Sequence, residues 1–162
     1  MRDDTRDFAP LPIRLMLGFG MLYHGWPKLF DAQGHQGFEA TLRGLGFPAA
    51  GPLAWLVGIV EVFGGLALFV GAFVGVAAAL LIVIQLVALF RVHLSSGFNF
   101  IHVTGVTDAG AQFGLPGYEV NLLYIAGLAA LLLGGAGTLS VERMLARRRR
   151  GAAQRSDTAP GG

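Results

Sequence analysis

Residues 62–90 read VFGGLALFVGAFVGVAAALLIVIQLVALF and contain no charged side chain. Gln85 is the one strongly polar residue in this stretch. Uncharged apolar runs of about 18 residues or more are typical of membrane spans. Because no hydrophilic loop interrupts the run and Gly71 favours a tight turn, the stretch predicts a helical hairpin. Its two spans run roughly over Leu53–Phe73 and Val76–Phe90.

Two further apolar segments, roughly Pro12–Phe30 and Tyr118–Leu139, predict a first and a fourth span. The composition agrees, because 54% of the 162 residues are hydrophobic and only 14% are charged, against about a quarter in soluble domains. A soluble fold would have too little polar surface to cover four such helices. We therefore predict an all-α membrane protein, a four-transmembrane-helix bundle that forms one domain over residues 12–142.

The basic residues predict the orientation of the bundle. Eight of the twelve Lys and Arg residues lie in the tails, at positions 2, 6, 143, 147–150 and 155. Because basic residues flank the cytoplasmic ends of spans, we predict that both termini are cytoplasmic, with tails over residues 1–11 and 143–162, the second one disordered. A nucleic-acid-binding protein would spread basic residues over a folded face, so nucleic acid is not an expected partner.

The connections and the glycines predict how the spans pack. Residues 31–51 are expected to hold a short amphipathic piece over Phe38–Leu45, and Arg91–Gly117 forms the longest loop, of a kind that is usually functional or mobile. Gly71 and Gly75 form a G-x-x-x-G pair at the hairpin, which favours close helix packing there. A substrate passage lined by glycines is the alternative interpretation.

Glu61 is the residue that most needs an explanation. It lies eight residues after Leu53, or about 12 Å along the helix, too deep for a short carboxylate to reach water. It must therefore be protonated, paired or directed into a polar cavity. His24 and Lys28 share one face of the first span, and Lys28 is the natural ion partner for Glu61 or Glu119. Gly58 and Gly65 share a face with Glu61 and would bring a neighbouring helix close.

Further polar residues fall on the same outer side of the predicted bundle, where they predict a cavity. Its candidate lining residues come from all four spans and are His24, Lys28, Glu61, Gln85, His93, Glu119 and Asn121. Such a cavity would suit a quinone or another small molecule with a polar head. Intramembrane ionisable groups favour a functional site by default, so Glu61, His24 and Lys28 are the candidate catalytic residues.

Several alternatives remain open for these residues. The Lys28 and Glu61 side chains would also pair in a purely structural role that fixes helix order. His24 and His93 lie at similar depth on different spans, which is the minimum requirement for a bis-histidine haem. No tight ligand spacing favours a metal site. Arg14 is either an anchor at the cytoplasmic interface or a residue that snorkels to it.

A series of short motifs follows a characteristic order along the chain. These are Arg14-Leu-Met-Leu-Gly18, His24-Gly-Trp-Pro-Lys28-Leu29, Glu61 with Gly64-Gly65-Leu66, Val92-His93, Gly97-Phe98, Gly117-Tyr118-Glu119, Asn121-Leu122-Leu123 and Gly135-Ala-Gly-Thr-Leu-Ser140. In this order the sequence resembles the DoxX family of small four-helix bacterial membrane proteins. The resemblance covers roughly Arg14–Glu142. Glu142 stands where the family often has Asp, and the stretch between Phe98 and Gly117 varies in the family.

The resemblance implies a multi-pass protein of the bacterial inner membrane with a link to membrane redox chemistry. We therefore expect a membrane subunit of a redox-linked complex that interacts with quinone and with a redox enzyme partner. With no cysteine in the chain, any electron carrier would come from the quinone or from the partner. The alternatives are a small-molecule or solute-handling membrane protein without catalysis, and a membrane scaffold for a partner enzyme. The oligomeric state is not predicted.

The orientation is testable with reporter fusions. A cytoplasm-active reporter and a periplasm-active reporter joined in turn to each terminus should give a cytoplasmic signal at both ends, because the arginine-rich tail follows an even number of spans. A periplasmic signal from the C-terminal fusion would overturn the predicted topology.

Overall fold

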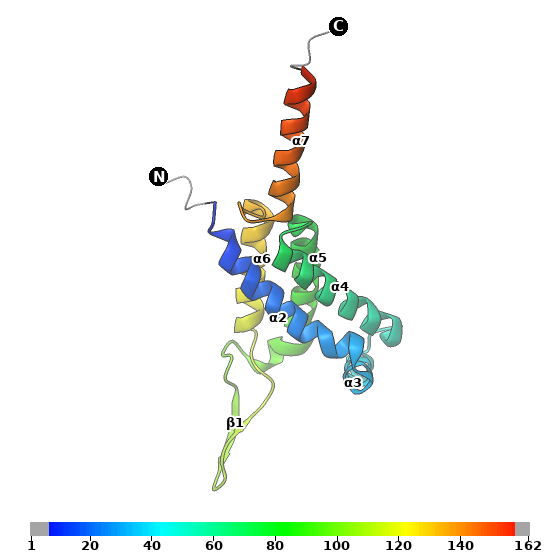
Figure 1. Cartoon of the computed structure of the whole chain (residues 1–162). Helices are drawn as coiled ribbons and strands as arrows, with labels where there is room; N and C mark the ends of the chain where they lie inside the picture. The colour runs from blue at the N-terminus through cyan, green and yellow to red at the C-terminus, as the bar shows by residue number, and fades with distance from the viewer. Residues whose placement is uncertain (1–6, 158–162) are drawn as a thin grey trace.

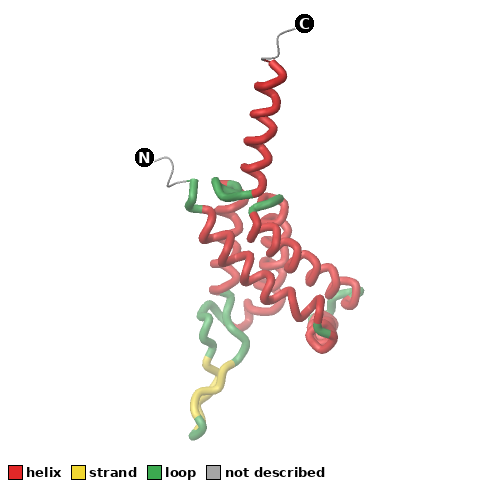
Figure 2. The backbone as a smooth tube through the Cα atoms, viewed as in Figure 1, coloured by secondary structure: helices red, strands yellow, loops and turns green. Residues whose placement is uncertain are grey.

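The computed structural model describes residues 7–157, which form a helical bundle with a protruding β-hairpin (Figures 1 and 2). The helices of the bundle are α2 (Pro10–Phe30), α4 (Ala50–Val70), α5 (Val74–Ala88) and α6 (Glu119–Gly134). A shorter helix, α3 (Ala32–Gly44), joins α2 to α4, and α7 (Val141–Asp157) follows α6. After α5 the chain continues helically to Ser96, first through a π-helical turn and then through a 3₁₀ turn.

The bundle consists of two helix pairs. One pair is α2 with α4, and the other is α5 with α6. The α4–α5 turn joins the pairs at one end, and from there α2 and α4 slant away from α5 and α6 toward α3 (Figure 1). The two pairs are therefore close at the end where α2 begins and α6 ends, and open at the other.

Glycines bring α2 and α4 into close contact. A methyl group added at Gly18 would come within 2.8 Å of the Gly65 carbonyl oxygen, and one added at Gly65 within 2.9 Å of the Gly18 carbonyl oxygen. The two backbones therefore touch directly, as small residues permit between membrane helices. This confirms the prediction that the glycine face of the second span brings a neighbouring helix close.

The outer surface of the bundle is apolar. Large hydrophobic side chains point outward from every bundle helix, for example Met16 (69% exposed), Phe63 (59%), Val83 (58%) and Leu133 (88%). The core is smaller and holds residues such as Met21, Leu81 and Leu128, all fully buried. A soluble monomer rarely exposes so large a contiguous apolar surface, whereas a bilayer would cover it.

Two helical stretches, Ala50–Val70 and Val74–Ser96, are long and apolar enough to cross a membrane. They are the predicted second and third spans, whose bounds the structure shifts by a few residues. Helix α2 has 21 residues but carries Arg14 and Lys28, and α6 has 16 residues. Crossing of the membrane by these two helices therefore stays a prediction.

Two connections and the C-terminal tail differ from the prediction. Helix α3 covers Ala32–Gly44, longer than the expected piece over Phe38–Leu45, because Asp31 caps it by accepting hydrogen bonds from two backbone N–H groups at its start. The long loop contains a hairpin of β1 (Val103–Thr107) and β2 (Gly110–Phe113). The tail predicted to be disordered over residues 143–162 is helical as far as Asp157; residues 158–162 lie outside the described part.

The end of the bundle near the termini is held by buried polar groups. Arg14 neither snorkels nor anchors at the surface, because it is 1% exposed and its Nη2 group donates a hydrogen bond to the Leu139 carbonyl oxygen at 2.7 Å. Its guanidinium lies against Gly71, which caps the C-terminal end of α4. Carbonyl dipoles at that end favour a cation. Arg14 therefore fixes the α4–α5 turn to α2.

Gly71 and Gly75 should respond differently to substitution. Gly71 has a φ of +73°, and a methyl group there would collide with Arg14 Nη1 and reach 2.6 Å from Ser140 Cβ. By contrast, the nearest atom to a methyl group at Gly75 is Leu132 Cδ1 at 3.9 Å, so the close packing predicted at Gly75 is absent.

We expect Gly71→Ala to lower the free energy of unfolding by about 2 kcal/mol or more, from the left-handed backbone and the collision together. Gly75→Ala is the matched control and should stay within about 0.5 kcal/mol. Thermal unfolding in detergent, followed by size-exclusion chromatography, measures both. Equal melting temperatures for the two variants would contradict this account of the turn.

Candidate functional site

The close contact of α2 with α4 places Lys28 opposite Glu61. A methyl group added at Gly25 would lie 2.7 Å from Glu61 Cβ, and one added at Gly58 would lie 3.3 Å from Lys28 Cβ. Each charged side chain thus starts beside a glycine of the facing helix. The two therefore meet inside the helix pair without displacing its backbones.

Lys28 and Glu61 form a bidentate ion pair. Lys28 Nζ donates hydrogen bonds to Glu61 Oε1 at 2.7 Å and to Oε2 at 2.6 Å. The Glu61 side chain is 6% exposed and that of Lys28 is 18% exposed. This confirms the prediction that Glu61 points into the bundle and contacts Lys28. Pairing with both oxygens offsets the cost of placing the carboxylate in an apolar environment.

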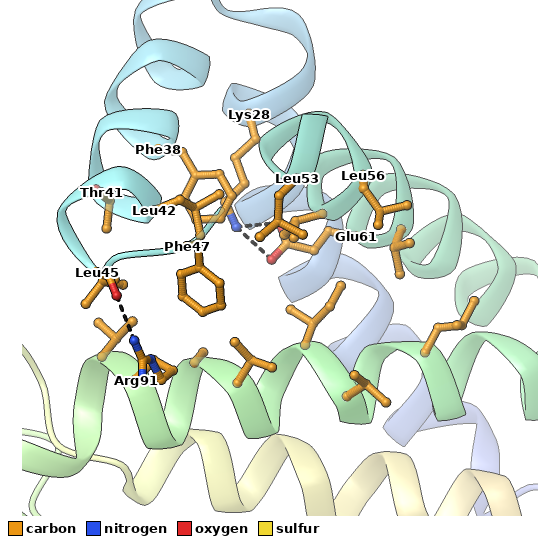
Figure 3. Close-up of a pocket in the computed structure, with 18 residues that line it drawn as sticks. Lys28, Phe38, Thr41, Leu42, Leu45, Phe47, Leu53, Leu56, Glu61 and Arg91 are labelled. Carbon is orange, nitrogen blue, oxygen red and sulfur yellow. Dashed lines mark hydrogen bonds and ion pairs between the residues drawn. The ribbon is translucent and has the colours of Figure 1, made fainter. Parts of the chain in front are cut away.

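The ion pair forms part of the wall of a cavity of about 350 Å³ (Figure 3). The cavity lies where α4 and α5 diverge, and α3 with the segment that follows it covers one side. Apart from the ion pair, Thr41 and Arg91, its lining is apolar. The apolar lining residues are Phe38, Leu42, Leu45, Phe47, Leu53, Leu56, Val57, Val60, Leu80, Val83, Ile84, Val87, Ala88 and Val92.

The cavity opens sideways, through the gap between α4 and α5. Leu56, Leu80 and Val83 line it and are also 56%, 49% and 58% exposed on the outer surface of the bundle. In a bilayer this gap would face the lipid. A lipid-soluble molecule could therefore enter the cavity without passing through water.

Arg91 lines the cavity just after the end of α5. It links this helical stretch to the segment after α3, which covers one side of the cavity. Its Nη2 group donates a hydrogen bond to the Leu45 carbonyl oxygen at 2.7 Å, and its guanidinium carbon lies 5.3 Å from the centre of the Phe47 ring. Sequence reasoning placed Arg91 only at the end of a span and missed this contact. The amphipathic pattern predicted at Phe38–Leu45 did indicate a segment that packs over the bundle near this contact.

A second, shallower hollow lies on the other side of Lys28. Its lining includes His24, Tyr23 and Trp26, and it shares Lys28 and Phe38 with the cavity. Lys28 Nζ lies 4.4 Å from the centre of the Phe38 ring, so these two side chains separate the two spaces. His24 is exposed, one helical turn from Lys28, and forms an edge-on contact with Tyr23 at 5.6 Å between ring centres.

The other candidate residues are not gathered around this cavity. Asn121 Nδ2 donates a hydrogen bond to Gln85 Oε1 at 2.8 Å, which joins α6 to α5 in the core. His93 Nδ1 lies 2.8 Å from the Pro116 carbonyl oxygen, and Glu119 Oε2 accepts a hydrogen bond from Phe100 N at 3.0 Å. These two residues fix the ends of the long loop. The polar residues that were predicted to line one cavity thus form separate contacts. Of these residues, only Lys28 and Glu61 line the cavity.

The described residues contain no group of three histidine or acidic side chains that would hold a metal ion. His24 lies in the hollow on the α2 side, and His93 pairs with the loop beyond α5. The two histidines therefore do not face a common space, which a bis-histidine haem would need.

Comparison with known proteins identifies the family. The family model of DoxX matches residues 9–94. The chain belongs to the DoxX family. The match runs from the residue before α2 to residue 94, within the helical stretch after α5, and all eighteen residues that line the cavity lie within it. The β-hairpin, α6 and α7 lie outside it, so the matched part is shorter than the resemblance over Arg14–Glu142. No curated protein and no solved structure matches the chain.

The Lys28–Glu61 pair allows its structural and functional roles to be separated. If its role is structural, Glu61→Gln should lower the free energy of unfolding by about 3 kcal/mol, because it leaves Lys28 charged and unpaired. Lys28→Met combined with Glu61→Gln should then restore much of the loss. If its role is functional, Glu61→Gln should leave the melting temperature nearly unchanged and abolish activity in cells.

The measurements are thermal unfolding of the purified variants and complementation of a deletion strain. Glu39→Gln, which removes the surface carboxylate that pairs with Arg43, is the matched control and should change neither. A Glu61→Gln protein that is both stable and fully active would contradict both roles.

Proposed function

We propose that this DoxX-family membrane protein is a subunit of a redox-linked complex in the bacterial inner membrane and binds a quinone in the cavity between α4 and α5. The observation that carries the proposal is the Lys28–Glu61 pair in the wall of an otherwise apolar cavity, part of whose lining is exposed on α4 and α5. A quinone has an apolar tail that partitions into the membrane and two carbonyl oxygens that accept hydrogen bonds. The cavity offers a surface for each part.

The lysine can bind a ligand without losing its partner. An ammonium group has three N–H donors, and the acceptors that the structure gives Lys28 Nζ are the two Glu61 oxygens. A third N–H is therefore free to donate to a carbonyl oxygen in the cavity. Arg91 at the other end of the cavity supplies a second cation, so the site favours an electron-rich head group over a cationic one.

Reduction of a quinone takes up two electrons and two protons, and the chain's own residues would handle the protons. In this proposal Lys28 donates one proton to a carbonyl oxygen as the quinone takes up electrons. The Glu61 carboxylate favours the ammonium form of Lys28, so the lysine is reprotonated and can donate the second proton. His24 lies in the neighbouring hollow, on the other side of Lys28. In this proposal it passes protons from that hollow to the lysine. The electrons come from a redox enzyme partner, since the chain has no cysteine.

The proposal includes a topology. Helices α2, α4, α5 and α6 each cross the membrane, and both termini are cytoplasmic. The support is that both ends of the described chain lie at one end of the bundle, where Thr138 N donates a hydrogen bond to the Asp7 carbonyl oxygen at 3.0 Å. The described basic residues that follow α6, Arg143 and Arg147–Arg150, are on that side.

A second candidate function uses the same cavity without electron transfer. A lateral opening and an apolar lining also suit a protein that holds or passes a lipophilic solute. A quinone that binds but is never reduced in the presence of candidate partners would favour the solute-handling function.

The scaffold alternative rests on the β-hairpin, which projects from the bundle (Figure 2). The hairpin exposes Val106 (79%) and Phe113 (67%).

Quinone binding is testable with the purified protein in nanodiscs. We expect short-tailed ubiquinone or menaquinone analogues to bind with a Kd in the micromolar range by isothermal titration calorimetry. Val57→Trp should weaken binding by about tenfold or more, because Val57 lines the cavity and the larger ring fills it. Ile59→Trp is the matched control, because Ile59 lies on the same helix, is 43% exposed and does not line the cavity.

Binding that is equally lost in both variants would indicate damage to the fold, which their melting temperatures would reveal. Binding that survives Val57→Trp unchanged would place the quinone elsewhere. No binding to the unmodified protein would overturn the proposed function.

A further inference from the structure

The base of α7 is fastened to the bundle by polar contacts. Glu142 Oε1 accepts a hydrogen bond from Val74 N at 2.8 Å, and Glu142 N donates to the Gly71 carbonyl oxygen at 3.2 Å. Arg143 forms an ion pair with Asp7 at 2.7 Å. The first turn of α7 is therefore tied both to the α4–α5 turn and to the start of the chain. These contacts fix the direction in which α7 leaves the bundle, which is outward from the end that carries the termini (Figure 1).

Four consecutive arginines, Arg147–Arg150, follow on α7 and surround its axis. Successive residues of an α-helix are turned by about 100°, so the four side chains point in four directions. All four are exposed, and none takes part in an ion pair with another described residue. We call these residues the arginine collar. A stripe on one side of the helix would suit a partner that docks there, whereas a collar suits a charged layer that surrounds the helix.

The arginine collar lies just beyond the head-group layer of a bilayer, within reach of long side chains. Glu142 is hydrogen-bonded to the first residue of α5, so the base of α7 lies level with the start of an apolar helix. The collar follows about 9–14 Å beyond Val141 at 1.5 Å per residue. The polar layer on each side of a bilayer is about 5–8 Å thick. The long, flexible arginine side chains can reach back from slightly outside that layer to the lipid phosphates.

The residues between the base and the collar agree with this placement. Met144 and Leu145 are apolar and are 48% and 46% exposed, with no protein surface packed over them. They occupy the level at which lipid chains meet head groups. Apolar side chains followed by cationic ones along the helix correspond to the order of acyl chain and phosphate in a lipid.

We propose that the arginine collar binds the phosphate groups of anionic lipids that surround α7, and so anchors the cytoplasmic end of the bundle. Guanidinium groups suit phosphate because their planar N–H donors bind it in pairs. The attraction to an anionic leaflet decreases steeply with ionic strength. This inference rests on the proposed topology but not on the proposed quinone site, which lies in the other half of the bundle, so failure of either test leaves the other unaffected.

The test is native mass spectrometry of the full chain in detergent with added dioleoyl phosphatidylglycerol or, separately, dioleoyl phosphatidylcholine. We expect the unmodified protein to retain phosphatidylglycerol at least about tenfold more tightly than phosphatidylcholine, with the preference reduced by added salt. A variant with all four collar arginines replaced by glutamine should lose most of that preference. A variant with four lysines, which keeps the charge, should keep most of it.

A matched control comes from the other end of the bundle. Arg43→Gln removes an exposed cation that is already paired with Glu39 and should leave the lipid preference unchanged. An unchanged preference in the four-glutamine variant would overturn the proposal and would leave the collar free for an acidic protein partner. Loss of the preference in the four-lysine variant to the same extent as in the glutamine variant would overturn the electrostatic basis of the proposal, because paired guanidinium N–H donors rather than charge would then carry the preference.

Discussion

The contact between α2 and α4 at their glycines is the constraint on which the rest of the molecule depends. Gly18 and Gly65 let the two backbones touch, and Gly25 and Gly58 continue the contact along the same faces. Without hydrophobic driving force inside a bilayer, such close packing is what holds helices together. The contact also sets the site, because Lys28 and Glu61 lie beside these glycines and can meet only when the helices are this close. A larger side chain at Gly25 would separate the ion pair as well as the helices.

The same pairing creates the cavity. Because α2 and α4 hold together as one unit and α5 and α6 as another, the bundle opens where the two units diverge. The open end is covered by α3, which Arg91 ties to α5 through the Leu45 carbonyl oxygen. The wall of the cavity therefore carries a charged pair in an otherwise apolar space. A site of this kind strengthens electrostatic contacts with a bound polar head, since little water screens them.

The opposite end of the bundle is closed by charges placed at helix ends. Arg14 lies at the C-terminal end of α4, and Glu142 accepts a hydrogen bond from the first N–H group of α5. Each charge has the sign that the helix dipole favours at that end. Gly71 stands between them in a conformation that other residues rarely adopt. One end of the molecule is thus fixed by buried polar contacts, while the other contains the cavity.

The sequence by itself determined the apolar helical hairpin, the turn at Gly71 and the need for a partner to Glu61, because these follow from hydropathy, local backbone preference and the cost of a buried charge. Depth and charge indicated Lys28 as a candidate partner for Glu61 or Glu119, and the structure pairs it with Glu61. The sequence could not decide which polar residues share one space. Gln85, His93, Glu119 and Asn121 lie at suitable depths, yet they pair with one another or with loop backbone, because the angle between the two helix pairs directs them elsewhere. Contacts between segments far apart in the chain determine that angle. They also determine the burial of Arg14 and the position of Arg91 in the cavity. Only the tertiary structure decides these, since no local pattern records which faces of two helices meet.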